Sequence, residues 1–448
     1  MRSIADRGAV VLDADMKATQ HVVEPRHLFT FGLISSMFFA WGLAANMTDT
    51  LLAAFKRILS LSDFQTTFVQ YAYFGAYFCF AIPASLLVKR FGYKAGILVG
   101  LGLYIAGALL FHPASVAMRY ESFLLALYVL AAGLSILETS ANPYVYALGS
   151  AQTATQRLNL AQSFNPIGAI TGALLGKLFI LGNLHHADAQ ARAGLDLATL
   201  HEIQSAELAG VMSPYVGVAC VLLLIWLIIA VRKIPAGGGA DSAESVDFAA
   251  TAARLLRRKR YMFAVGTQFV YVGAQVGIWS FTIRYVMDRL GVNEAQAASY
   301  YTASLVLFFV SRFVCTWLMS VIRAEVLLGV LAVVAAALSL IAAFSYGKPG
   351  VYTLIGVSGC MSLMFPTIYG MGLAGLGADA KLGGAGLVMA IVGGAIVTGF
   401  QGVVSDRLGD IGKSFVVPAI CFVTVAIFAF TVRGATLRDA RPIDGVLE

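Results

Sequence analysis

Charged residues are what this sequence has least of. Only 12% of its 448 residues are Asp, Glu, Lys or Arg, whereas an average soluble domain has about 25%. Hydrophobic residues make up 59%, and the mean hydropathy is +0.80. A chain of this composition cannot cover its surface with polar groups in water, so we expect an integral membrane protein.

The sequence also lacks the motifs of several function classes. It has no GxxxxGK[ST] loop, which excludes a P-loop ATP-driven motor and leaves an ion gradient as the driving force. No two of its five cysteines share a metal-ligand spacing, so we expect no metal and no other cofactor. We find no nucleophile–base pair, and we expect a protein that is not an enzyme. Five of the six histidines fall in the termini or predicted loops, and His112 is the last residue of a predicted span, so a proton carrier in the middle of the membrane must be a carboxylate.

Long apolar runs indicate helices rather than a barrel. About 20 apolar residues span a bilayer as a helix, whereas a barrel strand needs about 9–11. Lipid offers the backbone no hydrogen-bond partners, so only helices or closed barrels cross it. We expect an all-α membrane protein with twelve transmembrane helices in two six-helix halves, the layout of a transporter. The predicted spans are 28–55, 64–88, 95–112, 121–147, 158–183, 213–231, 261–287, 297–319, 326–346, 350–376, 383–405 and 414–432.

These spans divide the chain into five parts. They are a tail at 1–27, a six-helix half at 28–231, a linker at 232–260, a second half at 261–432 and a tail at 433–448. The first tail is mixed and polar, so we expect no cleavable signal peptide. Most Lys and Arg residues fall in the tails and alternate loops, which predicts that both termini are cytoplasmic in a bacterial inner membrane. This bias accounts for the net charge of +7 without nucleic acid as a partner.

Two connecting segments allow two interpretations each. The basic end of the linker, LLRRKR at 255–260, is either part of a short helix on an anionic leaflet or a solvated loop. The stretch at 184–212 either forms an amphipathic surface helix or extends the sixth span outward.

Two carboxylates lie inside apolar spans. An ionised carboxylate in hydrocarbon costs about 2.5–3.5 kcal/mol even on the lenient insertion scale. Asp49 in the first span shares a helix face with Asn46, three residues earlier, so carboxylate and amide together could bind hydroxyl groups. The alternative is a solvated Asp49 near the outer helix end.

The second carboxylate is Glu138, near the middle of the fourth span. Asn142 follows one turn later, and Pro143 frees a backbone carbonyl and can kink the helix. Burial disfavours the charged form of a carboxyl, so Glu138 would be protonated much of the time and could donate a hydrogen bond to a sugar. The alternative is a structural hydrogen bond between helices.

Three further sets of polar residues lie in spans. Gln162 and Asn165 share one face of the fifth span, and Gln275 and Trp279 share a face of the seventh with Gln268 and Tyr271. Amides bind sugar hydroxyls and aromatic rings stack on the apolar faces of pyranoses, although both sets could be packing residues. Arg312 in the eighth span is expected to snorkel to the cytoplasmic interface.

Several of these residues fall in longer motifs. They are FFAWGLAANMTDTLL at 38–52, AAGLSILETSANP at 131–143, RLNLAQSFNPIGA at 157–169 and YVGAQVGIWSFTIRY at 271–285. With these motifs the sequence resembles the L-fucose–proton symporters, in the fucose/galactose/glucose–proton branch of the major facilitator superfamily. The resemblance covers nearly the whole chain.

The resemblance implies a central sugar cavity between two halves. It implies that Asp49 is the proton-coupled acid beside the sugar and that the buried acid Glu138 is also required. It further implies that Asn46, Gln162 and Asn165 line the cavity. Two positions depart from the pattern: Leu382 stands where the family has a tyrosine that reaches the cavity, and Pro166 where serine is expected.

The sequence therefore predicts a monomeric symporter that imports L-fucose with protons by alternating access. A carrier for galactose, glucose or an amino sugar is the first alternative, because Leu382 and Pro166 weaken the case for fucose. A membrane sugar sensor is a second, and the lack of a sizeable soluble signalling domain argues against it. The expected partners are a monosaccharide, protons and the lipid bilayer, with no nucleic acid or nucleotide.

Overall fold

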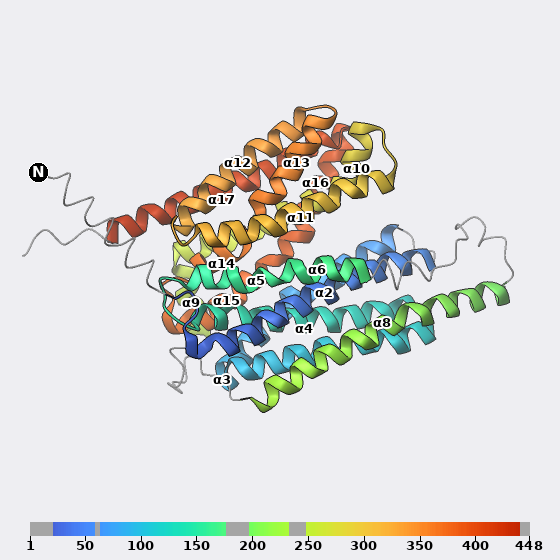
Figure 1. The fold of residues 1–448 in the computed structure, drawn as a ribbon, viewed down its shortest axis with the longest axis horizontal. Coiled ribbons are helices and arrows are strands. Elements are labelled where there is room, and N and C mark those ends of the chain that lie inside the picture. Colours follow the sequence, from blue (N-terminus) through green and yellow to red (C-terminus); the bar gives the residue numbers. More distant parts are fainter. Residues whose placement is uncertain (1–20, 59–62, 176–196, 233–247, 440–448) are drawn as a thin grey trace, which may run out of the picture.

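The computed structural model describes residues 21–58, 63–175, 197–232 and 248–439. All regular elements in these ranges are helices, most of them long and antiparallel to their neighbours (Figure 1). Seven helical segments among the described residues are long and apolar enough to cross a membrane. The architecture thus agrees with the hydropathy of the sequence.

The first group of helices contains two departures from one helix per span. Its elements are η1 (Pro25–His27), α2 (Leu28–Ile58), α3 (Asp63–Ala117), α4 (Tyr120–Ala147), α5 (Ala154–Gln162), α6 (Phe164–Leu175) and α8 (Leu197–Val231). Helix α3 holds two predicted spans that meet at Gly92, whose φ of 84° favours glycine. The fifth span is divided at Ser163 into α5 and α6, just before Pro166.

The second group repeats the broken span. Its elements are α9 (Phe248–Arg257), α10 (Lys259–Leu290), α11 (Glu294–Leu318), α12 (Ala324–Phe344), α13 (Lys348–Met361), α14 (Met364–Leu373), η4 (Gly377–Asp379), α15 (Ala380–Met389), η5 (Ala390–Val392), α16 (Gly393–Leu408), η6 (Gly412–Phe415) and α17 (Val416–Asp439). The tenth predicted span is divided between Met361 and Met364, again just before a proline, Pro366. A proline removes one helical hydrogen bond and crowds the preceding turn, which explains both breaks.

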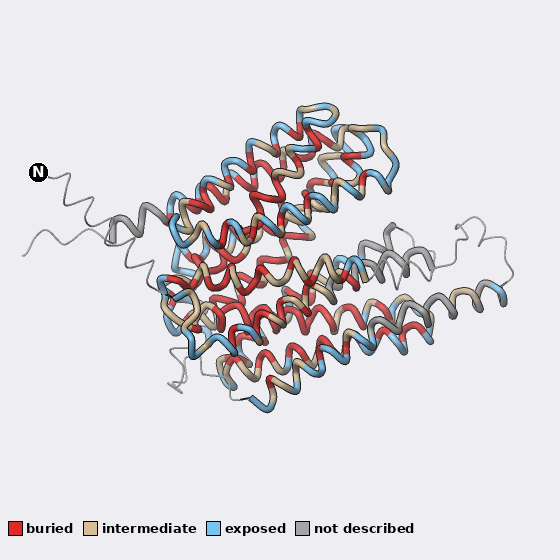
Figure 2. Tube along the Cα trace, viewed as in Figure 1, coloured by how far each residue is buried: buried red, intermediate tan, exposed pale blue. Residues whose placement is uncertain are grey.

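The helices form two bundles, α2–α8 and α10–α17, which meet at one end (Figure 1). We call this the linker end, because it holds the start of α2, helix α9 and the part of α3 around Lys89, which lines a small pocket with Phe248 of α9. There α5 contacts α11 and α14, and α15 contacts α3 and α4. Buried residues line this junction in Figure 2. The two halves are therefore packed together at the linker end.

The two ambiguous connecting segments are both helical where the structure describes them. Residues 248–257 form α9, which packs on α10 and α15. Arg254 Nη2 lies 2.7 Å from Asp379 Oδ1, and Arg258 Nη1 donates to Gly375 O at 2.9 Å. The linker helix is thus held against the second bundle. Helix α8 begins at Leu197, so the sixth-span helix extends into the predicted loop; residues 184–196 lie outside the described residues.

Small residues set the distance between α2 and α6. A Cβ at Gly168 would lie 2.8 Å from Leu43 N, and a Cβ at Gly42 would lie 3.0 Å from Ala169 N. Neither backbone position leaves room for a side chain. This is the close approach that small residues permit between membrane helices.

Gly168→Ala should therefore destabilise the protein by about 1–3 kcal/mol, the usual range for overpacking. Gly32→Ala on α2 is the matched control, because a Cβ at Gly32 meets nothing within 4 Å. Thermal unfolding of the purified protein in detergent measures both variants. Equal melting temperatures for the two would contradict the packing argument.

Candidate functional site

The central feature of the interior is a carboxyl group on α4. Glu138 is 4% exposed, and α4 is buried at every residue from Leu130 to Val145. Tyr77 Oη of α3 donates to Glu138 Oε1 at 3.2 Å. The second oxygen, Oε2, is buried and has no hydrogen-bond partner in the described part of the chain. One half of the carboxyl group is thus held and the other half is not.

A tyrosine of the second bundle faces the helix that carries this acid. The Tyr369 hydroxyl is buried, and it too has no hydrogen-bond partner among the described residues. A Cβ at Gly384 would lie 2.7 Å from Tyr369 Oη and 2.9 Å from Pro143 Cγ. The hydroxyl therefore sits where α14 and α15 face α4.

Two predicted site residues contact each other one turn from Glu138. Gln162 Nε2 donates to Asn142 Oδ1 at 2.9 Å, and both side chains are buried. Asn142 Nδ2 has no partner within the described ranges. The amide pair therefore joins α4 to the end of α5 and keeps one donor unused.

The side-chain amides of Asn46 on α2 and Asn165 on α6 donate to backbone carbonyls rather than to that pair. Asn165 Nδ2 donates to Phe38 O at 3.3 Å, and Asn46 Nδ2 donates to Gly42 O at 3.2 Å. Both residues are half-buried. Asp49 belongs to α2, but its side chain lies outside the described residues, so its orientation stays a prediction.

The aromatic face of α10 contacts α13 and α11. Trp279 Nε1 donates to Ser358 Oγ at 3.3 Å, and its ring meets the Phe308 ring edge-on at 5.1 Å. Gln275 on the same helix is half-buried. Gln268 is fully buried, and neither of its amide atoms has a partner among the residues described here. This helix thus adds another unsatisfied polar group to the interior.

The prediction for Arg312 was wrong. The residue is only 4% exposed and does not reach an interface. Its Nε donates to Ser362 O at 2.6 Å and its Nη1 to Gln162 O at 3.2 Å. The breaks in the fifth and tenth spans supply these carbonyls, so the guanidinium is satisfied inside the protein.

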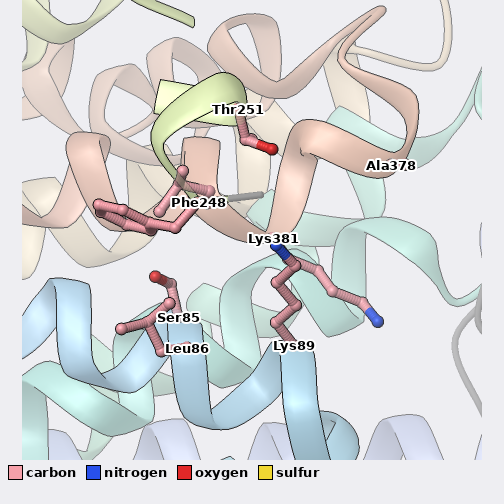
Figure 3. A pocket seen from close by; sticks show the side chains of 8 residues that line it. Ser85, Leu86, Lys89, Phe248, Thr251, Ala378 and Lys381 are labelled. Atoms are coloured by element: carbon pink, nitrogen blue, oxygen red, sulfur yellow. The ribbon is translucent and has the colours of Figure 1, made fainter. Parts of the chain in front are cut away.

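Sequence reasoning missed the two tyrosines near Glu138. The spacing of Tyr73 and Tyr77, whose ring centroids lie 5.3 Å apart, was the available signal on α3. Tyr369 carried no signal, because a tyrosine is an ordinary residue in an apolar run. The structure also shows that Leu382 lines a small cavity of about 30 Å³ at the linker end, with Lys89, Lys381 and Phe248 (Figure 3).

Tyr77→Phe should lower stability by about 0.5–1.5 kcal/mol, because it removes the hydrogen bond to Glu138 Oε1. Tyr71→Phe is the control, since Tyr71 lies on the same helix and is 62% exposed. Thermal unfolding in detergent compares the two. If both variants unfold at the same temperature as the wild type, the Tyr77–Glu138 contact contributes nothing to stability.

Comparison with known proteins identifies the family. Residues 30–379 match the family model described as Major Facilitator Superfamily. The chain is 40% identical to the L-fucose-proton symporter of Haemophilus influenzae, over 91% of this chain and 97% of that one. It is 34% identical to the glucose/galactose transporter of Brucella abortus, over 89% of this chain and 93% of that one.

A solved structure extends the similarity to three dimensions. The crystal structure of FucP, a Major Facilitator Superfamily transporter, in the outward conformation superposes with a TM-score of 0.86 at 40% identity. The match covers 91% of this chain and 99% of that chain. The relatives are transporters rather than enzymes, and the predicted all-α membrane fold and the family resemblance are both confirmed. The chain therefore belongs to the Major Facilitator Superfamily, in the branch that includes the fucose–proton symporters.

Proposed function

We propose that this protein is a proton-coupled symporter that imports L-fucose by alternating access. The supporting relative at 40% identity is an L-fucose-proton symporter. The observation that carries the proposal is the state of Glu138: a buried carboxyl group with one oxygen held by Tyr77 and the other without a partner in the described part of the protein.

A carboxyl group in this position couples a proton to movement. An ionised carboxylate buried at membrane depth is unfavourable, so the group must be neutralised before the protein closes around it. We assign this role to Glu138 and, beside the sugar, to Asp49. The outward-facing carrier takes up a proton, binds sugar between its halves and rocks inward. Sugar and proton leave, and the empty carrier returns.

Polar atoms around Glu138 match the chemistry of a sugar. Glu138 Oε2, Asn142 Nδ2 and Tyr369 Oη are buried and have no partner among the described residues. A ring of hydroxyl groups, each both donor and acceptor, could satisfy such atoms. We assign the remaining contacts to polar groups from both halves and to one aromatic ring. These residues are Asn46, Asp49, Gln162, Asn165, Gln275 and Trp279.

The contacts between the halves indicate which conformation of the transport cycle the structure represents. The bundles pack together at the linker end. Under the positive-inside rule that end, with Lys89, Arg90 and the basic cluster at 257–260, would face the cytoplasm. We therefore interpret the structure as outward-facing, in a bacterial inner membrane with both termini inside. The proposal also includes a transporter that works as a monomer.

The test of this function is a panel of sugars added to energy-depleted cells that carry the protein. L-fucose should make the medium more alkaline, because each sugar enters with a proton. A response to galactose or glucose but not to L-fucose would favour the second candidate, which the 34% identity to a glucose/galactose transporter supports. No pH change with any sugar would contradict symport and favour a sensor.

Asp49→Asn should abolish accumulation of L-fucose against a gradient while exchange of labelled for unlabelled sugar persists. An amide keeps a polar group at the site but cannot carry the proton. Uptake and counterflow in the same vesicles separate the two activities. An Asn variant that still concentrates sugar would remove Asp49 as the coupling group.

Glu138→Gln should be milder than Glu138→Ala in sugar binding, because glutamine retains a donor and fills the space. The alanine variant also leaves the Tyr77 hydroxyl without its acceptor. Glu294→Gln, at the exposed start of α11, is the matched control for loss of a carboxylate. Equal losses in Gln and Ala would show that the titrating proton itself is needed at this position.

A further inference from the structure

The two carbonyls that Arg312 binds share a sequence feature. Gln162 lies four residues before Pro166, and Ser362 lies four residues before Pro366. In a continuous helix the amide N–H of each later residue would donate to the earlier carbonyl, but proline has no N–H. Both carbonyls therefore need another donor. Arg312 Nη1 and Nε lie 3.2 and 2.6 Å from them.

One guanidinium thus bridges breaks in two different halves. Arg312 and Ser362 belong to the second bundle, whereas Gln162 belongs to the first. The guanidinium is buried, lies 4.8 Å from the centre of the Phe308 ring, and forms no ion pair within the described residues. A buried cation without a carboxylate is held by these carbonyls and this ring.

The contact reaches the candidate site through Gln162. The side chain of the same residue donates to Asn142, one turn from Glu138. Two other bonds join the same face of α5 to the second half: Gln156 Nε2 to Thr316 O and Asn159 Nδ2 to Thr367 Oγ1, each 3.1 Å. Residues 156, 159 and 162 follow helical spacing, so the contacts run along one face of α5 up to the amide pair.

We propose that Arg312 is a positioning residue of the sugar site: it fixes the end of α5, and so the Gln162–Asn142 pair, only while the halves are closed at the linker end. When that end opens, Gln162 O loses its donor and the pair loses its support. The site then binds sugar less tightly toward the cytoplasm, which promotes release. This inference rests on the proposed function, because it assigns the pair to the sugar.

The test needs a protein locked in the closed state, so that positioning is separated from a shift between conformations. A Cβ at Gly370 would lie 3.3 Å from Thr155 Cβ, across the two halves and close to the range of a disulfide. Thr155→Cys with Gly370→Cys, oxidised, should hold the linker end closed. L-fucose binding to this purified locked protein is then measured by calorimetry.

In the locked protein, Arg312→Met should weaken L-fucose binding about tenfold, the effect of one lost bond to a charged donor. Gln156→Ala is the control: it removes a half-buried contact between the halves without touching the amide pair, and it should change binding less than about twofold. An Arg312→Met protein that binds like the locked parent would overturn the inference.

A second variant tests the route through the carbonyl. Pro166→Ala restores an N–H that can donate to Gln162 O, so Arg312→Met in that background should weaken binding only about threefold or less, as expected for coupled residues. A full tenfold loss in that background would show that Arg312 does not act through Gln162 O. If the locked parent binds no sugar of the panel, the proposed function itself fails. If the locked parent binds L-fucose and Arg312→Met does not weaken that binding, only this inference fails.

Discussion

Every polar atom at membrane depth must find its partner inside the protein, and the structure depends on this constraint. The backbone meets it by forming helices, because lipid offers no donors or acceptors. Where the helices break, side chains supply the hydrogen bonds that the backbone has lost. Arg312 donates to Ser362 O and Gln162 O, two carbonyls that precede prolines by one turn. Several buried atoms of the described residues have no such partner, and two of them, Glu138 Oε2 and Asn142 Nδ2, lie one turn apart on α4.

Two buried arginines show how differently the same group can be used. Arg157 donates to Val145 O at 2.8 Å and to Thr153 Oγ1 at 3.1 Å, and so closes the connection between α4 and α5 within one bundle. Arg312 instead joins the two bundles. The first contact can persist as the bundles move as rigid bodies, whereas the second must break when the linker end opens. The location of a buried cation, rather than its burial, thus separates a structural role from one in the transport cycle.

The sequence was sufficient for the features that depend on one segment at a time. Apolar runs predicted the helices, and the spacing of Glu138 and Asn142 placed both on one face of α4. The sequence did not predict contacts between segments that are distant along the chain. Nothing in the sequence pairs Gln162 with Asn142 rather than with Asn165, and Tyr77 and Tyr369 look like ordinary residues of apolar spans. The breaks near Pro166 and Pro366 were not predicted, and only the structure shows that one arginine serves both.

The central claim is that binding of sugar and uptake of a proton by buried acids are linked. The direct measurement is the proton uptake of the purified protein when L-fucose is added in weakly buffered detergent solution, across a range of pH. The account predicts uptake that rises as the pH of the solution rises through the range where the free protein loses its proton. It predicts that this uptake is lost when the acids are replaced by amides. Sugar binding with no proton uptake at any pH would contradict it.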